Sequence, residues 1–260
     1  MDLRYTDGGT RLDYVMTKPT TRGIETGVLL FSGGRDSTIA AVRLAKELRK
    51  LTLVTITSGH LVALGNVKSR LHELSSILPE NTEWVHAVVK QEPLTFDSLL
   101  SLSHSLPMPE MPRDLKSCLP CHLSYIRIAF EVANREKAKY IATGYTSYQS
   151  NWLEQTPHAI TRLRQVLKKH SIELLLPSLP VLSKEDARGV LRSYNLFDDS
   201  LEQICLKQQF NDQLVTMDEM TREVDVWAEH LDQALATSLS EDFQINAPIT
   251  ISEVDSDDNR

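Results

Sequence analysis

A chain of 260 residues, 41% hydrophobic and 24% charged, is long enough for one sizeable α/β domain with a small helical addition. It has no apolar run near the roughly 20 residues of a membrane span, no signal-peptide core in its first 25 residues and only three cysteines, which favours a cytoplasmic protein without membrane contact. The net charge of −7 argues against indiscriminate nucleic-acid binding, but it does not exclude a specific RNA substrate.

Short apolar segments alternate with segments of helical periodicity, an order typical of a parallel sheet covered by helices. We therefore expect an α/β fold with a doubly wound parallel sheet of about five strands, in which ligands bind beyond the carboxyl ends of the strands. The predicted strands are 28–31, 53–57, 84–89, 140–143 and 173–176, and the predicted helices are 38–50, 66–77, 123–135, 159–170 and 184–194.

The segment 32–38 lies directly between the first predicted strand and the first predicted helix. Its two glycines allow a tight turn and a close backbone approach, while the first amides of the helix and the helix dipole favour a bound anion. No Gly-x-x-x-x-Gly-Lys-Ser/Thr sequence is present, so this is not a Walker-type loop. The candidate phosphate-binding residues are Ser32, Gly33, Gly34, Arg35, Asp36, Ser37 and Thr38.

This segment resembles the Ser-Gly-Gly-x-Asp-Ser loop of the PP-loop ATP pyrophosphatases, which have the adenine nucleotide alpha hydrolase-like (HUP) fold. The resemblance implies a loop that holds the phosphates of ATP, and an enzyme that adenylates a carbonyl or carboxyl oxygen with loss of pyrophosphate. It also implies that Asp36 lies in the Mg²⁺ and pyrophosphate region, and that Thr57 and Ser58 contact adenosine. The alternative is a glycine turn with a purely structural role.

Two cysteine segments are similar to the tRNA 2-thiouridine synthases, and with the glycine loop this likeness covers about residues 27–206. The first segment is Cys118-Leu-Pro-Cys121-His, before a helix and a strand that ends in Ala-Thr-Gly144-Tyr. The second begins with Leu-Pro-Ser-Leu-Pro at 176–180 and ends at Cys205. The resemblance implies that Cys121 and Cys205 form the catalytic pair, and that Gly144 belongs to the cofactor site.

The resemblance implies an ATP-dependent sulfurtransferase that replaces a nucleobase carbonyl oxygen in tRNA or a small molecule with sulfur from a separate sulfur donor. The chain departs from the family at Tyr145, where the family has a histidine, and at residues 146–148, where many relatives have paired acids. Two other functions stay open: a PP-loop ligase that forms an amide or nitrile on a deazapurine, and a non-catalytic nucleotide-binding partner module.

Three uses of the cysteines stay open. Cys118 matches the additional ligand of relatives that hold a 4Fe–4S cluster, so Cys118, Cys121 and Cys205 are the candidate cluster ligands. The same side chains could instead bind Zn²⁺, with His122 or another residue as the fourth ligand, or Cys121 and Cys205 could act as a persulfide pair. In each case we expect the three cysteines to lie at one site beside the ATP phosphates.

The rest of the chain divides around the proposed PP-loop domain, residues 27–211. Residues 1–26 form a polar N-terminal segment, and the proline-containing stretch 91–117 is interpreted as an active-site loop. The segment 212–240 is a helical extension with an apolar stripe, expected to pack on the domain or to form a homodimer contact. Residues 241–260 are expected to be a disordered acidic tail.

Overall fold

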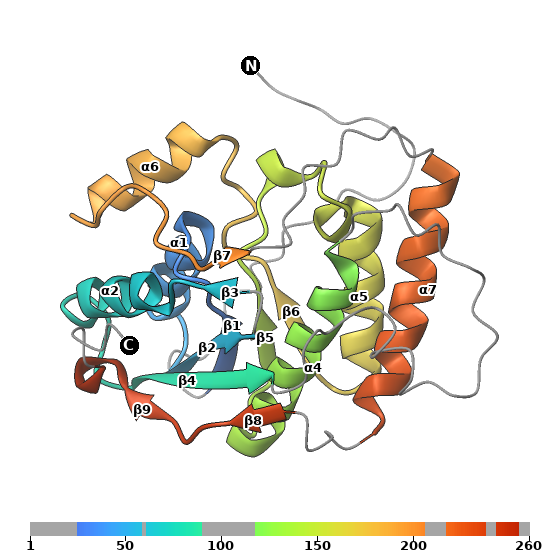
Figure 1. Ribbon diagram of the computed structural model, residues 1–260, viewed down its shortest axis with the longest axis horizontal. Helices are drawn as coiled ribbons and strands as arrows, with labels where there is room; N and C mark the ends of the chain where they lie inside the picture. Colours follow the sequence, from blue (N-terminus) through green and yellow to red (C-terminus); the bar gives the residue numbers. More distant parts are fainter. Residues whose placement is uncertain (1–24, 59–60, 90–117, 206–216, 238–242, 255–260) are drawn as a thin grey trace.

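The computed structural model describes residues 25–58, 61–89, 118–205, 217–237 and 243–254 (Figure 1). Strands and helices alternate through most of this part of the chain, and short 3₁₀ turns follow β5 and β9. The elements are β1 (Thr26–Leu30), α1 (Arg35–Leu44), β2 (Lys50–Thr57), β3 (Leu61–Val62), α2 (Leu64–Ser75), β4 (Thr82–Val89), α4 (Leu119–Glu136), β5 (Tyr140–Ala142), η2 (Ser147–Gln149), η3 (Leu153–Gln155), α5 (Pro157–Lys169), β6 (Glu173–Leu175), α6 (Lys184–Ser193), β7 (Ile204–Cys205), α7 (Met217–Leu235), β8 (Phe243–Ile245), β9 (Ile249–Thr250) and η4 (Ile251–Glu253).

Five strands form a parallel sheet in the order β6-β5-β1-β2-β4, which confirms the predicted doubly wound α/β fold. The chain builds outward from β1 in one direction through β2 and β4, then returns to the other side of β1 for β5 and β6. The connections that follow β1 and β5 therefore leave the sheet on opposite faces. Ligands bind at this switch point in open α/β sheets.

Alternate residues of each strand face opposite sides of the sheet, so each face has its own hydrophobic core. On β1, Val28 packs with the core under α4, α5 and α7, whereas Leu29 packs with the core under α1, α2 and α6. Figure 1 shows these two groups of helices on opposite sides of the sheet. Both strand residues are fully buried, as expected for a parallel sheet covered on both faces.

The first helix is shorter than its periodicity predicts. It ends at Leu44, and the prediction that it continues to residue 50 is wrong, because Lys50 already pairs with Thr26 at the start of β2. The pairing of β3 with β7 was missed, because two-residue strands have no readable periodicity. That short ladder places Cys205, a predicted site residue, opposite Leu61.

The apolar stripe of α7 packs within the domain, which is one of the two expected roles of this helix. Val224, Trp227, Leu231 and Leu235 are each at most 5% exposed and belong to the core shared with α4 and α5. None of the described helices is both long and apolar enough to cross a membrane.

The prediction of a disordered tail after residue 240 is wrong for residues 243–254. Here β8 and β9 pair antiparallel with β4, with Phe243 opposite Val89 and Ile249 opposite Trp84. The outer edge of β4 has backbone N–H and C=O groups that need partners. The segment 243–254 supplies these partners although it contains few apolar residues. The expected loop at 91–117 and the acidic residues 255–260 lie outside the described residues.

Candidate nucleotide site and adjoining cysteines

A cavity of about 310 Å³ opens beyond the carboxyl ends of β1, β2 and β5. Its walls come from the loop after β1, the first turns of α1 and α4, the segment after β5 and the loop before β7. The lining residues are Leu30, Phe31, Ser32, Gly34, Arg35, Asp36, Ser37, Val54, Ile56, Leu61, His122, Tyr125, Thr143, Gly144, Tyr145, Gln149, Gln155, Ser200, Glu202 and Gln203.

The loop after β1 has the geometry of an anion cradle. Gly33 has φ of +78°, a conformation that glycine adopts at little cost, and it turns the chain into α1. Since α1 begins at Arg35, the amides of its first turn have no acceptor within the helix. The Ser32 and Ser37 hydroxyls lie 3.2 Å apart at the cavity wall. Thr38 is placed differently, because its buried hydroxyl donates to the Gly34 carbonyl at 2.7 Å.

The turn after β5 presses directly on the start of α1. A Cβ atom at Gly144 would lie 2.7 Å from the Ser37 nitrogen and 2.9 Å from its Cα. At the other side of the loop, a Cβ at Gly33 would lie 2.5 Å from the Leu201 carbonyl oxygen. Backbone from three parts of the chain is therefore in contact around the cradle, and side chains at these two positions would force it apart.

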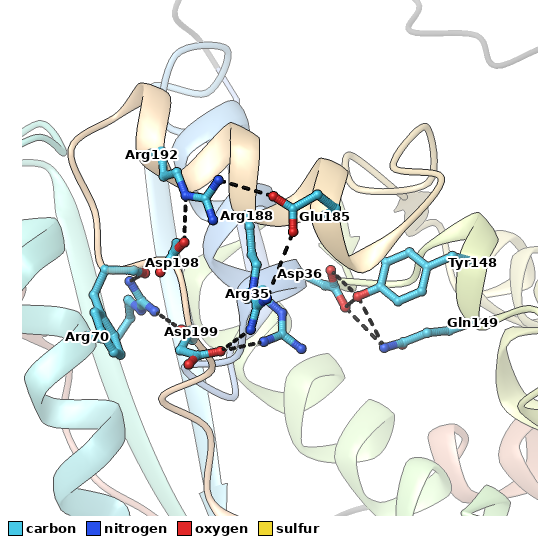
Figure 2. Close-up of polar contacts among 11 residues, drawn as sticks. Arg35, Asp36, Arg70, Tyr148, Gln149, Glu185, Arg188, Arg192, Asp198 and Asp199 are labelled. Carbon is cyan, nitrogen blue, oxygen red and sulfur yellow. Dashed lines mark hydrogen bonds and ion pairs between the residues drawn. The ribbon is translucent and has the colours of Figure 1, made fainter.

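Asp36 is the charged centre of this wall (Figure 2). The Tyr148 hydroxyl donates to its two carboxylate oxygens at 2.9 and 2.7 Å, and Gln149 Nε2 donates at 3.2 Å. Burial raises the pKa of Asp36, while the Tyr148 hydrogen bond and the Arg35 charge oppose that rise. Sequence reasoning did not assign Tyr148 or Gln149 to the site, although it noted that residues 146–148 depart from the family pattern.

A fully buried arginine holds the loop before β7 against α2. Arg70 donates to the carbonyl oxygens of Phe197 and Asp199 at 2.8 and 2.6 Å, and to Glu73 at 2.7 Å. The Asp199 carboxylate in turn lies 3.3 Å from Arg35 and accepts from Arg188 at 3.0 Å, as Figure 2 shows. These contacts keep the loop that carries Ser200, Glu202 and Gln203 at the cavity wall.

The end of β2 contributes apolar rather than hydroxyl side chains to the cavity. Val54 and Ile56 line it, and strand alternation turns Thr57 to the other face, where its hydroxyl lies 2.8 Å from His86 Nε2. Ser58 is buried. The two residues expected at adenosine are thus close to the site in the chain but are not among the residues that line the cavity.

The three cysteines lie next to the cavity, at its α4 end. Cys118 is the N-cap of α4, Cys121 lies in its first turn, and Cys205 lies on β7. No disulfide joins them, and all three belong to the described residues. Burial, with smaller contributions from the charges of Glu154, Cys121 and Cys205, raises the pKa of the Cys118 thiol to about 12. The three side chains are therefore within electrostatic range of one another.

The cysteines do not form a metal site as the described residues are arranged. Within those residues, no three His, Cys, Asp or Glu side chains are grouped closely enough to hold a metal ion. The described residues therefore show neither the alternative zinc site nor an assembled ligand set for a 4Fe–4S cluster. By contrast, the cradle, its close backbone contacts and the apolar wall suit a nucleotide polyphosphate with its base.

Two polar side chains, His122 and Tyr145, line the cavity at the α4 end, near the cysteines. His122 Nδ1 lies 2.8 Å from the Tyr145 hydroxyl, and His122 Nε2 lies 3.9 Å from the Glu154 carboxylate. Burial lowers the pKa of His122, and it raises the pKa of Tyr145. Tyr145 stands where the family has a histidine, and the structure brings His122 to it from α4. Sequence reasoning considered His122 only as a zinc ligand.

The fold is shared with known structures, although no protein-family model and no curated protein matches the sequence. A 4-thiouridine synthetase solved with RNA and bound ATP superposes with a TM-score of 0.52 at 18% identity, covering 85% of this chain and 55% of the synthetase. The present chain thus spans about half the length of that synthetase.

Two other solved structures are more distant. NMN synthetase from Francisella tularensis has a TM-score of 0.46 at 13% identity over 88% of this chain and 92% of the synthetase. The U34-tRNA thiolase NcsA from Methanococcus maripaludis, solved with its 4Fe–4S cluster, has a TM-score of 0.44 at 12% identity over 83% and 72%. The present chain therefore shares the α/β fold of the 4-thiouridine synthetase, which agrees with the fold that its glycine loop predicted.

Proposed function

We propose that the protein is an AMP-forming, ATP pyrophosphatase-type sulfurtransferase. A nucleobase carbonyl oxygen, in tRNA or in a small molecule, attacks the α-phosphorus of ATP, and the bond to pyrophosphate breaks. Sulfur then attacks the activated carbon, and AMP leaves with the former carbonyl oxygen. The observation that supports this proposal is the placement of three cysteines close to the cavity that the phosphate cradle lines, since the cavity residues His122 and Leu61 adjoin Cys121 and Cys205.

The residues of the cradle have separate roles in this proposal. The amides of the first turn of α1 and the hydroxyls of Ser32 and Ser37 hold phosphate oxygens, because helix N-termini favour anions. Asp36 faces the Mg²⁺ and pyrophosphate region. The apolar surface of Val54 and Ile56 packs against the adenine base. Mg²⁺, when bound, neutralises the charge that develops on the leaving pyrophosphate.

For the sulfur step we favour a cysteine pair over a metal centre, since the described cysteines do not assemble a metal ligand set. One of Cys121 and Cys205 carries the sulfur of a separate donor as a persulfide, whose terminal sulfur attacks the activated carbon. The other thiolate then attacks the inner sulfur and releases the thiocarbonyl product. The disulfide that forms is reduced by an external thiol before the next turnover.

The first test measures the products of ATP. Purified protein, supplied with ATP, Mg²⁺, a persulfide (sulfane-sulfur) donor, a thiol reductant and unmodified tRNA, should release AMP and pyrophosphate. Asp36→Ala should abolish this release without unfolding the chain, because the residue lies in a polar wall rather than in the apolar core. Asp218→Ala, at an exposed position of α7, is the matched control. Release of ADP and orthophosphate would contradict the proposal.

The second test identifies the acceptor. Mass spectrometry of RNA and metabolites from a deletion strain should show the loss of one thiolated species. Loss of a deazapurine nitrile or amide would instead support the ligase alternative. An unchanged profile would support the non-catalytic module.

A further inference from the structure

A chain of side-chain hydrogen bonds runs through the segment after β5 and ends at Asp36. The backbone N–H of Thr146 donates to Gln155 Oε1 at 3.1 Å. Gln155 Nε2 donates to Gln149 Oε1 at 2.8 Å, and Gln149 Nε2 donates to Asp36 Oδ2 at 3.2 Å. The Tyr148 hydroxyl adds its donation to both carboxylate oxygens.

The donor-to-acceptor direction of these hydrogen bonds is fixed at both ends of the series. A backbone N–H can only donate, so Gln155 must turn its carbonyl oxygen toward Thr146 and its NH₂ group toward Gln149. Gln149 must then accept through its oxygen and present its NH₂ group to Asp36. An ionised carboxylate can only accept, so the last link agrees with the first. Neither glutamine can rotate its amide by 180° without breaking two hydrogen bonds.

The 3₁₀ turns place these side chains. Gln149 ends η2 and Gln155 ends η3, and both line the cavity. Other charges face Asp36 from the surrounding elements: Arg35 on α1 and Lys184 at the start of α6 attract it, whereas Glu202 in the loop before β7 repels it. The donors offset the repulsion by Glu202 and the loss of water around a partly buried carboxylate.

We propose that Gln155, Gln149 and Tyr148 are positioning residues that hold the Asp36 carboxylate in one orientation. Tyr148 and Gln149 donate to it directly, and Gln155 acts through Gln149. Asp36 then meets the Mg²⁺ and pyrophosphate region without reorganisation, which is how preorganised polar groups accelerate reactions. The inference deepens the proposed function and rests on it. Gln155 acts at a distance, through Gln149, and this separates its role from that of a group that touches the nucleotide.

The decisive variant is Gln155→Glu. A carboxylate there still accepts from the Thr146 N–H, but it cannot donate to Gln149. The Gln149 amide therefore turns around and presents its oxygen to Asp36. We expect kcat for pyrophosphate release to fall by about tenfold or more, the scale of one lost charge-assisted hydrogen bond, with little change in KM for ATP. Gln165→Glu, at an exposed position of α5, adds the same charge and should leave kcat unchanged.

The order of the kcat losses caused by two substitutions distinguishes a positioning role of Gln155 from a purely structural role. Gln155→Met removes both hydrogen bonds but leaves the Gln149 amide able to face Asp36 with its donors, so it should be less harmful than Gln155→Glu. A purely structural role predicts the reverse order, because Glu keeps the shape of Gln and one of its hydrogen bonds. In a Gln149→Leu background, Gln155→Glu should have no further effect on kcat, because the link to Asp36 is already absent.

A second readout does not depend on turnover. In the nucleotide-free protein, NMR of side-chain amides should show the Gln149 NH₂ signals shifted by the carboxylate, and Gln155→Glu should move them. If wild-type protein releases no pyrophosphate while these signals behave as expected, the proposed function is wrong, but the inferred orientation of the hydrogen bonds is correct. If wild-type protein is active but Gln155→Glu changes neither kcat nor the Gln149 signals, the inference is overturned.

Discussion

The two ends of the candidate site differ in how completely they are assembled. At the phosphate cradle, backbone from α1, the turn after β5 and the loop before β7 is in contact, and Asp36 has three donated hydrogen bonds. At the α4 end, the charges of Cys121 and Cys205 contribute to the raised pKa of Cys118, but the three cysteines form no metal site within the described residues. Cys118 directly follows the segment 90–117, and Cys205 directly precedes the segment 206–216; both segments lie outside the described residues.

The difference shows that a polyphosphate site can be built mainly from backbone, whereas sulfur chemistry depends on side chains from distant parts of the chain. Backbone amides at a helix N-terminus need only the correct turn. The thiols must be brought together by α4 and β7, and their reactivity then depends on burial and neighbouring charge. Substitutions at one end should therefore leave the other end unchanged.

The largest effect is expected from Cys121→Ser and from Cys205→Ser. Either change should reduce the thiolated product to background, because no second thiolate completes the sulfur transfer. ATP binding, measured by calorimetry, should be unchanged, since neither side chain lines the cavity. Cys118→Ser separates the two cysteine mechanisms: a persulfide pair predicts a small effect, and a cluster predicts the same complete loss. Weakened ATP binding in Cys121→Ser would show that the two ends are coupled.

A smaller but still large effect is expected for the alkylation of Cys118. With a pKa of about 12, nearly all of this thiol is protonated at pH 8. Its carbamidomethylation should therefore be roughly a thousandfold slower than that of an ordinary exposed cysteine, because only the thiolate reacts. The rate should rise about tenfold per pH unit until the pH approaches the pKa. Mass spectrometry of labelled peptides measures it, and rapid labelling at pH 8 would contradict burial at this end.

The smallest effect is expected from Gly144→Ala. The added Cβ meets the Ser37 backbone, which cannot move without displacing the cradle, so we expect a loss of about 1–3 kcal/mol in the free energy of unfolding. ATP binding should weaken in parallel. Gly189→Ala is the matched control, because a Cβ there meets nothing within 4 Å. That change lies inside α6 and should stabilise the protein by about 0.5–1 kcal/mol. Urea unfolding and calorimetry measure both variants.

Much of the fold could be predicted because its signals are local. The five parallel strands appear as short apolar runs. The loop at residues 32–38 is recognised as a phosphate cradle because a strand precedes it and a helix follows it. The failures have causes that are not local, because both depend on pairing between strands. The end of α1 depends on where Lys50 pairs, and the segment 243–254 is ordered by the free edge of β4 rather than by its own composition.

Part of the site could not be predicted, because it joins residues that are far apart in the chain. Nothing in the sequence pairs Arg70 with the carbonyls of residues 197 and 199, or His122 with Tyr145. Strand alternation is a signal that could have placed Val54 and Ile56 at the cavity, whereas the prediction placed the hydroxyl residues that follow them there.

The sequence by itself determined the class of fold and the position of the phosphate cradle, because both follow from hydrophobic periodicity and from the turn that two glycines permit. Only the tertiary structure decided which side chains contact Asp36 and how the three cysteines are arranged and buried. Tyr148 and Gln149 reach Asp36 across 112 and 113 positions of the chain. Burial, which sets the protonation of Cys118, exists only once α4 and β7 have packed beside the cavity.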